Sequence, residues 1–184
     1  MRERILDTTD RLFYGQGIRA VGVDTIAAEI GISKRTLYNY FPSKEALIVA
    51  YLRRRLIAIA PSDRSPAEQI LGLFDWHERS FASSRFHGCP FVNAVAELGA
   101  PAEEARLIAI AYKEQRRLWF RELLTQLGVR DPDGLATQLM ILVDGAVATA
   151  LVRGDPKAAH HAREAARTLL AAAGVSVPAV DQER

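Results

Sequence analysis

Six polar side chains between positions 34 and 40 carry groups that bond nucleic acid well. Lysine and arginine donate hydrogen bonds to guanine edges or phosphates, asparagine pairs with adenine, and threonine and tyrosine reach phosphates or thymine methyl groups. The set is Lys34, Arg35, Thr36, Tyr38, Asn39 and Tyr40. Lys44 follows near the start of another expected helix, whose free N–H groups offer a second grip on a phosphate. These residue types predict a surface that contacts duplex DNA.

The segment 25–41 has the pattern of two short helices joined by a tight turn. Gly31 takes the positive φ that such a turn requires without strain, and Ser33 is a good N-cap for the second helix. Leu37 and Phe41 are expected to point into a core. The polar set is then left on the outer surface and its edges.

Residues 1–52 resemble the N-terminal domain of the TetR/AcrR repressors. The matching pieces are Phe13–Gly17 (FYGQG), Val23–Ala27 (VDTIA), Gly31–Ser33 (GIS), Thr36–Tyr38 (TLY) and Tyr40–Leu47 (YFPSKEAL). The resemblance implies that the polar set of 34–40, together with Thr25, faces an operator and that Lys44 holds a phosphate. Gly22 departs from the usual Thr or Ser, which removes one hydroxyl for a phosphate. Arg35 stands where a small residue is common, so it adds a contact peculiar to this chain.

Charge is unevenly distributed along the 184 residues, whose formal net charge is +2. Residues 1–55 hold ten basic and six acidic side chains, a net charge of +4, whereas the remainder carries −2. A basic N-terminal part on a near-neutral body is typical of a nucleic-acid contact confined to one end. The run 53–55 of three arginines is expected to be a solvated helix face, with a DNA contact as the alternative.

Helical periodicity continues through the rest of the chain and predicts an all-α fold of about nine helices. A linker rich in Pro and Ser, 61–66, divides the chain into a helix-turn-helix DNA-binding domain, 1–60, and a ligand-binding and dimerisation domain, 61–184. The body is expected to contain a stripe over 70–81, a short helix at 91–98 and a long one at 102–127. Two further helices are expected at 133–153 and 156–173.

Several bulky or polar residues of the body are unusual for helix interiors and predict a pocket for a small-molecule effector. They are Trp76, His77, Phe81, Phe91, Asn93, Glu97, Tyr112, Gln115 and Trp119. For each one singly, a core or surface residue without a ligand is the stronger interpretation. As a set they favour a pocket. A ligand that fits one shape of the body would move the fourth helix and misplace the recognition helices.

A single recognition helix gives too little affinity, so a homodimer is expected to set two of them roughly 34–36 Å apart on a near-palindrome. The last two helices supply the expected dimer surface, with small residues that let helices approach closely. The predicted interface residues are Leu139, Leu142, Val143, Ala146, Ala162, Ala166 and Leu169. The alternative is that these stripes pack only within one chain.

An enzyme is the rival hypothesis from another class. Cys89 and His77 suggest a thiolate pair, and His160 and His161 stand together, but no third catalytic partner or phosphate-binding motif is found. Adjacent histidines on a helix point about 100° apart, which suits a shared metal poorly. We therefore expect no catalytic, metal or cofactor site. A redox role for Cys89 and a helical interaction module that has lost DNA binding stay open.

The sequence also predicts where the protein acts. The most apolar stretch, 135–152, carries Gln138, Asp144 and Gly145, so no membrane span is expected. Arg2, Glu3 and Arg4 interrupt the start, so no secretory signal is expected there. One cysteine excludes an internal disulfide. The expectation is a cytoplasmic protein whose partners are an operator duplex, an unidentified small-molecule effector and a second copy of itself.

Overall fold

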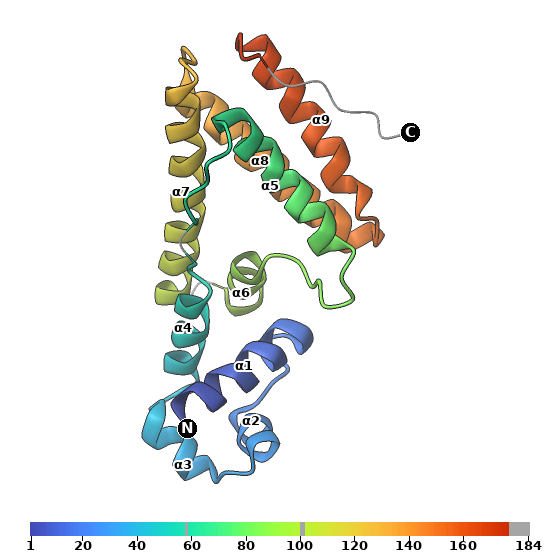
Figure 1. The fold of residues 1–184 in the computed structure, drawn as a ribbon. Helices are drawn as coiled ribbons and strands as arrows, with labels where there is room; N and C mark the ends of the chain where they lie inside the picture. Colours follow the sequence, from blue (N-terminus) through green and yellow to red (C-terminus); the bar gives the residue numbers. More distant parts are fainter. Residues whose placement is uncertain (58, 100–101, 177–184) are drawn as a thin grey trace. The chain divides into compact units, whose positions relative to one another are not determined.

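A computed structural model describes residues 1–57, 59–99 and 102–176, and over these ranges the chain forms nine α-helices and no β-strand (Figure 1). The helices are α1 (Arg2–Gln16), α2 (Val23–Ile30), α3 (Lys34–Tyr40), α4 (Lys44–Arg54), α5 (Pro66–Phe81), α6 (Pro90–Leu98), α7 (Glu103–Gln126), α8 (Pro132–Arg153) and α9 (Lys157–Ala172). The all-α prediction is confirmed, and every helix expected from the sequence is present.

The chain divides into two compact units. The first contains Met1–Ile59 and Cys89–Lys113, so it holds α1 to α4, α6 and the first part of α7. The second contains Ala60–Gly88 and Glu114–Arg184, with α5, the rest of α7, α8 and α9. The N-terminal segment of the first unit ends at Ile59. The unit also takes in α6, which the sequence analysis assigned to the body.

The core of the first unit is made by apolar side chains that recur at helical spacing. Those from α1 to α4 with almost no exposed surface are Ile5, Leu6, Leu12, Phe13, Ile26, Leu37, Leu47 and Leu52. Phe91 and Ala94 of α6 are buried in the same core. Burying a side chain of this size contributes roughly 1.5–3 kcal/mol. Helices as short as α2 and α3 are not stable alone, so this packing holds them in place.

The connector between α1 and α2 is held by one charged side chain from each of two other helices. Lys44 Nζ, at the start of α4, donates a hydrogen bond to the carbonyl oxygen of Ile18 over 2.6 Å. The backbone N–H of Arg19 donates to Glu97 Oε2 of α6 over 2.9 Å. Gly17 starts the connector with φ of 94°, and an added Cβ there would lie 3.1 Å from the Glu97 carboxylate. The path into α2 is therefore set by contacts from α4 and α6.

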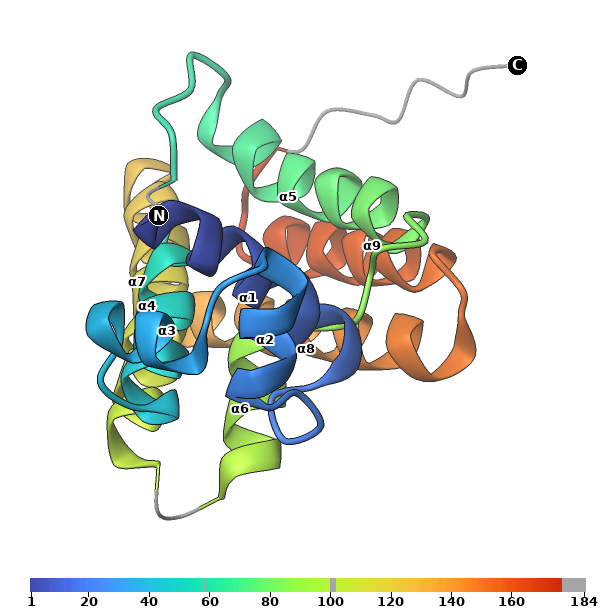
Figure 2. The ribbon, with the colours of Figure 1, turned by 90° about the horizontal axis from the view of Figure 1, so that it is seen from below.

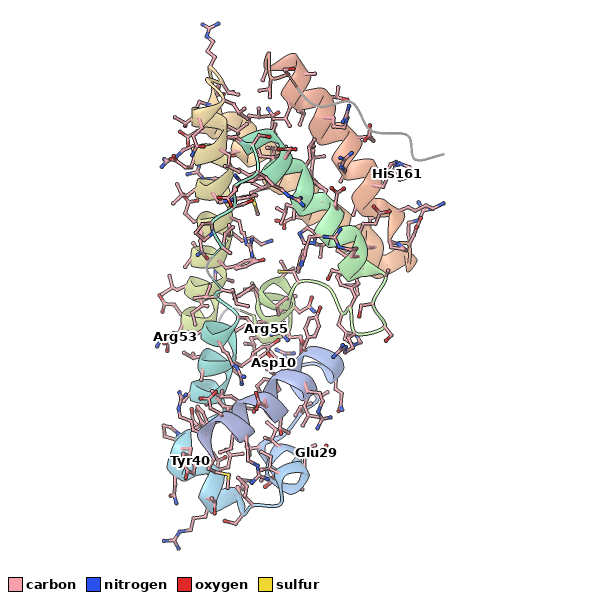
Figure 3. All side chains as sticks on the ribbon, in the orientation of Figure 1. Asp10, Glu29, Tyr40, Arg53, Arg55 and His161 are labelled. Carbon is pink, nitrogen blue, oxygen red and sulfur yellow. The ribbon has the colours of Figure 1, made fainter. Side chains whose placement is uncertain are left out.

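Three consecutive arginines at the end of α4 each form an ion pair within the first unit. Arg53 contacts Glu104 of α7 over 3.0 Å, and Arg54 contacts Asp7 of α1 over 2.6 Å. Arg55 binds both carboxylate oxygens of Asp10, over 2.6 and 2.8 Å, and also lies over the Tyr14 ring at 4.3 Å (Figure 3). Side chains engaged in this way tie α4 to α1 and α7. Their partners favour the structural interpretation of the run over a DNA contact.

The second unit is a bundle in which α8 lies against α9 and α5 packs on both (Figure 1). Its core is apolar and includes Ile70, Phe74, Phe120, Leu139, Ala136, Ala159, Ala166 and Leu170. The start of α5 carries a capping box, because Ser65 accepts from the Glu68 N–H while Glu68 accepts from the Ser65 N–H. Arg163 of α9 pairs with Asp75 of α5 over 2.8 Å. The ion pair joins α5 to α9, and the capping box stabilises the start of α5.

One of the described helices, α8, is long and apolar enough to cross a membrane by length and composition. One side of it is buried within the second unit, through residues such as Leu139, Val143 and Ala150. The core helix of a globular bundle has the same length and composition. This property of α8 is therefore weak support for a membrane span.

The ion pair between Asp10 and Arg55 is expected to contribute more stability than the exposed pair between Arg53 and Glu104. Asp10→Asn leaves a half-buried guanidinium without its charged partner and should lower the free energy of unfolding by about 1–3 kcal/mol. Glu104→Gln removes an exposed pair and should change it by no more than about 0.5 kcal/mol. Urea unfolding followed by circular dichroism measures both. Equal effects of the two substitutions would contradict this ranking.

Candidate nucleic-acid interface

The helix-turn-helix predicted from the sequence is present as α2, a tight turn and α3 (Figure 2). Gly31 ends α2 in the left-handed conformation, with φ of 73°, and its N–H donates to the carbonyl of Ala28 over 3.0 Å. The Ser33 hydroxyl caps α3 by accepting from the Thr36 N–H over 3.0 Å. Both sequence signals, the glycine of the turn and the serine cap, are confirmed. They set the angle at which α3 leaves α2.

Two apolar side chains decide which face of α3 is outside. Leu37 is completely buried, and Phe41, directly after the helix, is buried as well. Because residues on a seven-residue helix are fixed relative to one another, this seating turns the remaining side chains outward. The exposed ones are Lys34, Arg35, Tyr38, Asn39 and Tyr40, the last of which is labelled in Figure 3.

Four of these outward side chains are free to bind a ligand. Within the described residues, no hydrogen bond or ion pair joins Arg35, Tyr38, Asn39 or Tyr40 to another side chain. Tyr38 and Tyr40 keep 37% and 44% of their surface exposed, which is high for tyrosine. Exposed aromatic rings and unpaired donors on one short helix are what a surface for base edges and phosphates requires.

Lys34 differs from its neighbours because it is already paired. Its Nζ donates to Asp24 Oδ2, in the first turn of α2, over 2.9 Å. The hydrogen bond to the Asp24 carboxylate, helped by the attraction of that charge, raises the pKa of Lys34. The pair places the ammonium beside the first turn of α2. Sequence reasoning missed Asp24 as a partner of Lys34.

Two further predicted DNA contacts lie within the helix-turn-helix. Thr25 is exposed in the first turn of α2, and Thr36 is half-buried with its hydroxyl 2.8 Å from that of Ser33. Gly22 caps α2 without a side-chain bond, as the departure from Ser or Thr predicted. The hydroxyl of Thr25 remains on the outer surface, whereas that of Thr36 is shared with the cap of α3.

Lys44 was predicted to hold a phosphate, and the structure gives it an internal contact. Besides its bond to the Ile18 carbonyl, its ammonium lies 5.8 Å from the centre of the Phe13 ring. An ammonium has three donors, so this bond leaves donors for a phosphate. The contact with the connector adds a role in positioning α2 that sequence reasoning missed.

The predicted effector residues fall in both units. Phe91, Asn93, Glu97 and Tyr112 belong to the first unit, where the Phe91 and Tyr112 rings stack at 4.0 Å and Glu97 binds the connector. The remaining five belong to the second unit and are Trp76, His77, Phe81, Gln115 and Trp119. The rings of His77 and Phe81 lie 5.3 Å apart there, and Phe86 extends the aromatic cluster. Glu97 is thus engaged with backbone, a contact sequence reasoning did not foresee.

Most of the predicted dimer residues are buried inside the second unit. Those with no more than 8% of their surface exposed are Leu139, Val143, Ala146, Ala162 and Ala166, while Leu142 and Leu169 are half-buried. The alternative interpretation, packing within one chain, accounts for the buried five. The exposed apolar face of α8 consists of other residues, Ile141, Gly145, Ala148 and Val152. When a helix is apolar on nearly every side, periodicity alone does not show which side is buried.

The residues considered for an enzyme site belong to α5, α9 and the N-cap of α6. Cys89 is a free, half-buried thiol at the N-cap of α6. His160 and His161 are exposed on α9, the latter labelled in Figure 3, and their ring centres lie 5.6 Å apart. In the ranges that the structure describes, no three His, Cys, Asp or Glu side chains gather in a way that would hold a metal ion.

Comparison with known proteins gives consistent matches at both ends of the chain. Residues 5–51 match the family of bacterial regulatory proteins of the tetR type, and residues 102–174 match the tetracyclin repressor-like C-terminal domain. A crystal structure of a TetR-family transcriptional regulator from Streptomyces coelicolor shares 32% identity, with a TM-score of 0.84. The match covers 94% of this chain and 95% of that one.

Two curated relatives match over shorter stretches. An HTH-type transcriptional regulator of Lactococcus lactis is 30% identical over 114 residues, 57% of this chain. An HTH-type transcriptional repressor of Mycobacterium tuberculosis is 31% identical over 127 residues, 64% of this chain. The chain spans 58% and 62% of the length of these two relatives. With the helix-turn-helix geometry and the full-length structural match, these findings show that the chain belongs to the TetR family of helix-turn-helix transcriptional regulators.

Proposed function

We propose that this protein is a homodimeric repressor that binds a near-palindromic DNA operator through α3 and is released by a small-molecule effector. The observation that carries the proposal is the outward set of Arg35, Tyr38, Asn39 and Tyr40, which have exposed side chains next to the buried Leu37. Repression is the common mode of the family, and the Mycobacterium tuberculosis relative is named as a repressor.

In the proposed complex, α3 lies in the major groove with its N-terminal residues towards base edges. Arg35 binds guanine through two donors, and Asn39 pairs with adenine. Tyr38, Tyr40 and Thr36 lie at the edges of the helix, where they reach phosphates. Thr25 and Lys44 add phosphate contacts from α2 and α4. Together these contacts fix the register of the helix on the duplex.

The proposed dimer uses the exposed apolar face of α8, continued by α9. Ile141 and Val152 keep 64% and 84% of their surface exposed, and the small Gly145 and Ala148 lie between them at helical spacing. A partner helix can approach such a face closely. The half-buried Leu142 and Leu169, from the predicted set, remain candidates at its margin. The buried residues of that set pack in the core of the second unit.

The proposed effector is an organic molecule with an apolar part, bound by aromatic and polar residues of the predicted set. Aromatic walls with few polar groups are typical of such sites. The proposed relay runs through α4 and α6, because Lys44 and Glu97 bind the connector that leads into α2. A ligand that favours one arrangement of these helices shifts the position of α3. A regulator that acts in this way works in the cytoplasm, without a membrane partner or cofactor.

The alternative is an interaction module that has lost DNA binding. The exposed polar side chains of α3 favour DNA binding over this alternative. Titration with duplex at several salt concentrations separates the two. A DNA-binding dimer loses affinity steeply as salt rises, because each phosphate contact releases counterions.

Base preference should depend on Arg35 and Asn39. Arg35→Ala and Asn39→Ala are each expected to cost about 1–3 kcal/mol on the best sequence and to relax preference at one base pair. Selection of duplexes from a random-sequence library, followed by fluorescence anisotropy, measures this effect. Arg130→Ala, at an exposed arginine before α8, is the matched control and should leave preference unchanged. Unaltered base preference in both recognition variants would contradict the proposed docking.

Substitution of a residue that contacts phosphates should lower the affinity for every DNA sequence by a similar factor. Tyr38→Ala is expected to weaken binding to every duplex by about 1.5–3 kcal/mol, because one hydrogen bond to a charged phosphate is lost. Lys44→Ala should also weaken binding uniformly, and it should lower thermal stability because the bond to Ile18 is lost. Anisotropy and thermal melts measure the two effects. Unchanged affinity in both variants would contradict the proposal that this surface binds DNA.

The exposed face of α8 should hold the dimer. Ile141→Lys places a charge in the proposed interface, so we expect monomers in sedimentation experiments and a large loss of operator affinity. Leu107→Lys is the matched control, since Leu107 is a similarly exposed apolar residue on α7 of the first unit. A variant at Ile141 that stays dimeric and binds DNA normally would rule out this interface.

A further inference from the structure

Asp24 is the one acidic side chain that forms an ion pair with α3 among the described residues. It lies in the first turn of α2, where the helix dipole favours an acid, and 72% of its side-chain surface is exposed. Its oxygen lies 2.9 Å from Nζ of Lys34, the first residue of α3. An acid next to the leading end of a DNA-binding helix weakens attraction to phosphates, so its presence calls for an explanation.

We propose that Asp24 is a specificity-determining residue, which positions Lys34 to read a guanine edge and keeps it from binding phosphates. The inference rests on the proposed DNA-binding function and adds a role for a residue outside the recognition helix. Asp24 acts through Lys34, so it is a positioning residue.

The pair with Asp24 limits which acceptors the Lys34 ammonium can bind. Lys34 has three N–H donors, and the pair with Asp24 uses one of them. The other two stay available in a direction that the pair fixes. Guanine offers neutral acceptors, O6 and N7, which tolerate a carboxylate nearby. A phosphate is an anion and is repelled by the same carboxylate. The pair therefore favours base contact over backbone contact.

The hydrogen bond to the Asp24 carboxylate raises the pKa of Lys34, so the ammonium keeps its charge near neutral pH. Because Lys34 stays charged, the carboxylate is not released by a change of pH near neutrality. The contact of 2.9 Å between Nζ of Lys34 and the Asp24 carboxylate places the ammonium beside the start of α2. Positioning of this kind favours the matching base and gives no advantage to a mismatched one.

The chain offers a matched control on the same helix. Glu29 is also exposed on α2, and it pairs with Arg11 of α1. Its substitution by Gln therefore removes the same charge without changing the ion pair to α3. Glu29 is labelled in Figure 3. Comparing Asp24→Asn with Glu29→Gln separates the effect of the Lys34 contact from the general effect of one negative charge.

The experiment measures affinity for two probes at several salt concentrations. One is a duplex that the wild-type protein selects from a random-sequence library, and the other is a shuffled duplex of the same composition. Asp24→Asn is expected to tighten binding to the shuffled duplex and to steepen its salt slope by about 0.9, the value for one added phosphate contact. The ratio of the two affinities should fall about fivefold or more. Glu29→Gln should leave this ratio unchanged.

A second variant tests whether Asp24 acts through Lys34. Lys34→Gln alone should weaken binding to the selected duplex and leave the salt slope on the shuffled duplex unchanged. In the Lys34→Gln background, Asp24→Asn should no longer alter either slope or ratio. Equal effects of Asp24→Asn and Glu29→Gln, or an effect of Asp24→Asn that persists without Lys34, would overturn the inference and leave the proposed function intact. Failure of the wild-type protein to select any duplex would overturn both.

Discussion

The burial of Leu37 is the contact on which the recognition surface depends. A helix of seven residues has too few hydrogen bonds to be stable by itself, so α3 exists because one side of it is seated in a core. That core is formed by α1, α2 and α4 and contains Ile5, Phe13 and Ile26. Rotation of α3 would expose Leu37 and bury charged side chains, and both changes cost free energy. The outward direction of the polar residues follows from this one constraint.

The same core explains why the connector matters. The entry of α2 is fixed by Gly17 and by hydrogen bonds from Lys44 and Glu97 to the backbone of the connector. Backbone groups in a connector need partners, and charged partners form stronger bonds than neutral ones. A change at α4 or α6 therefore reaches α2 directly. The position of α3 is then a consequence of contacts made outside the helix-turn-helix.

Local signals in the sequence predicted the fold well. Helical periodicity, the glycine of the turn at Gly31, the cap at Ser33 and the Pro-rich starts of α5 and α8 located the helices, because these features act within one or two turns. The outward face of α3 was predictable for the same reason. Contacts between segments far apart in the sequence were not predictable in this way. Glu97 reaches the connector from 78 positions away, and periodicity has no information on such a pairing. The direction of burial on α8 was missed because the helix is apolar on both sides.

The most direct test of the account is a photo-crosslinking measurement on the intact protein. A benzoylphenylalanine placed at position 38 should crosslink to the duplex that the wild-type protein selects, because Tyr38 is exposed beside the buried Leu37. The same group at position 76, where Trp76 is exposed in the second unit, should give no crosslink to DNA. Crosslinking at position 76 with none at position 38 would contradict the assignment of α3 as the recognition helix.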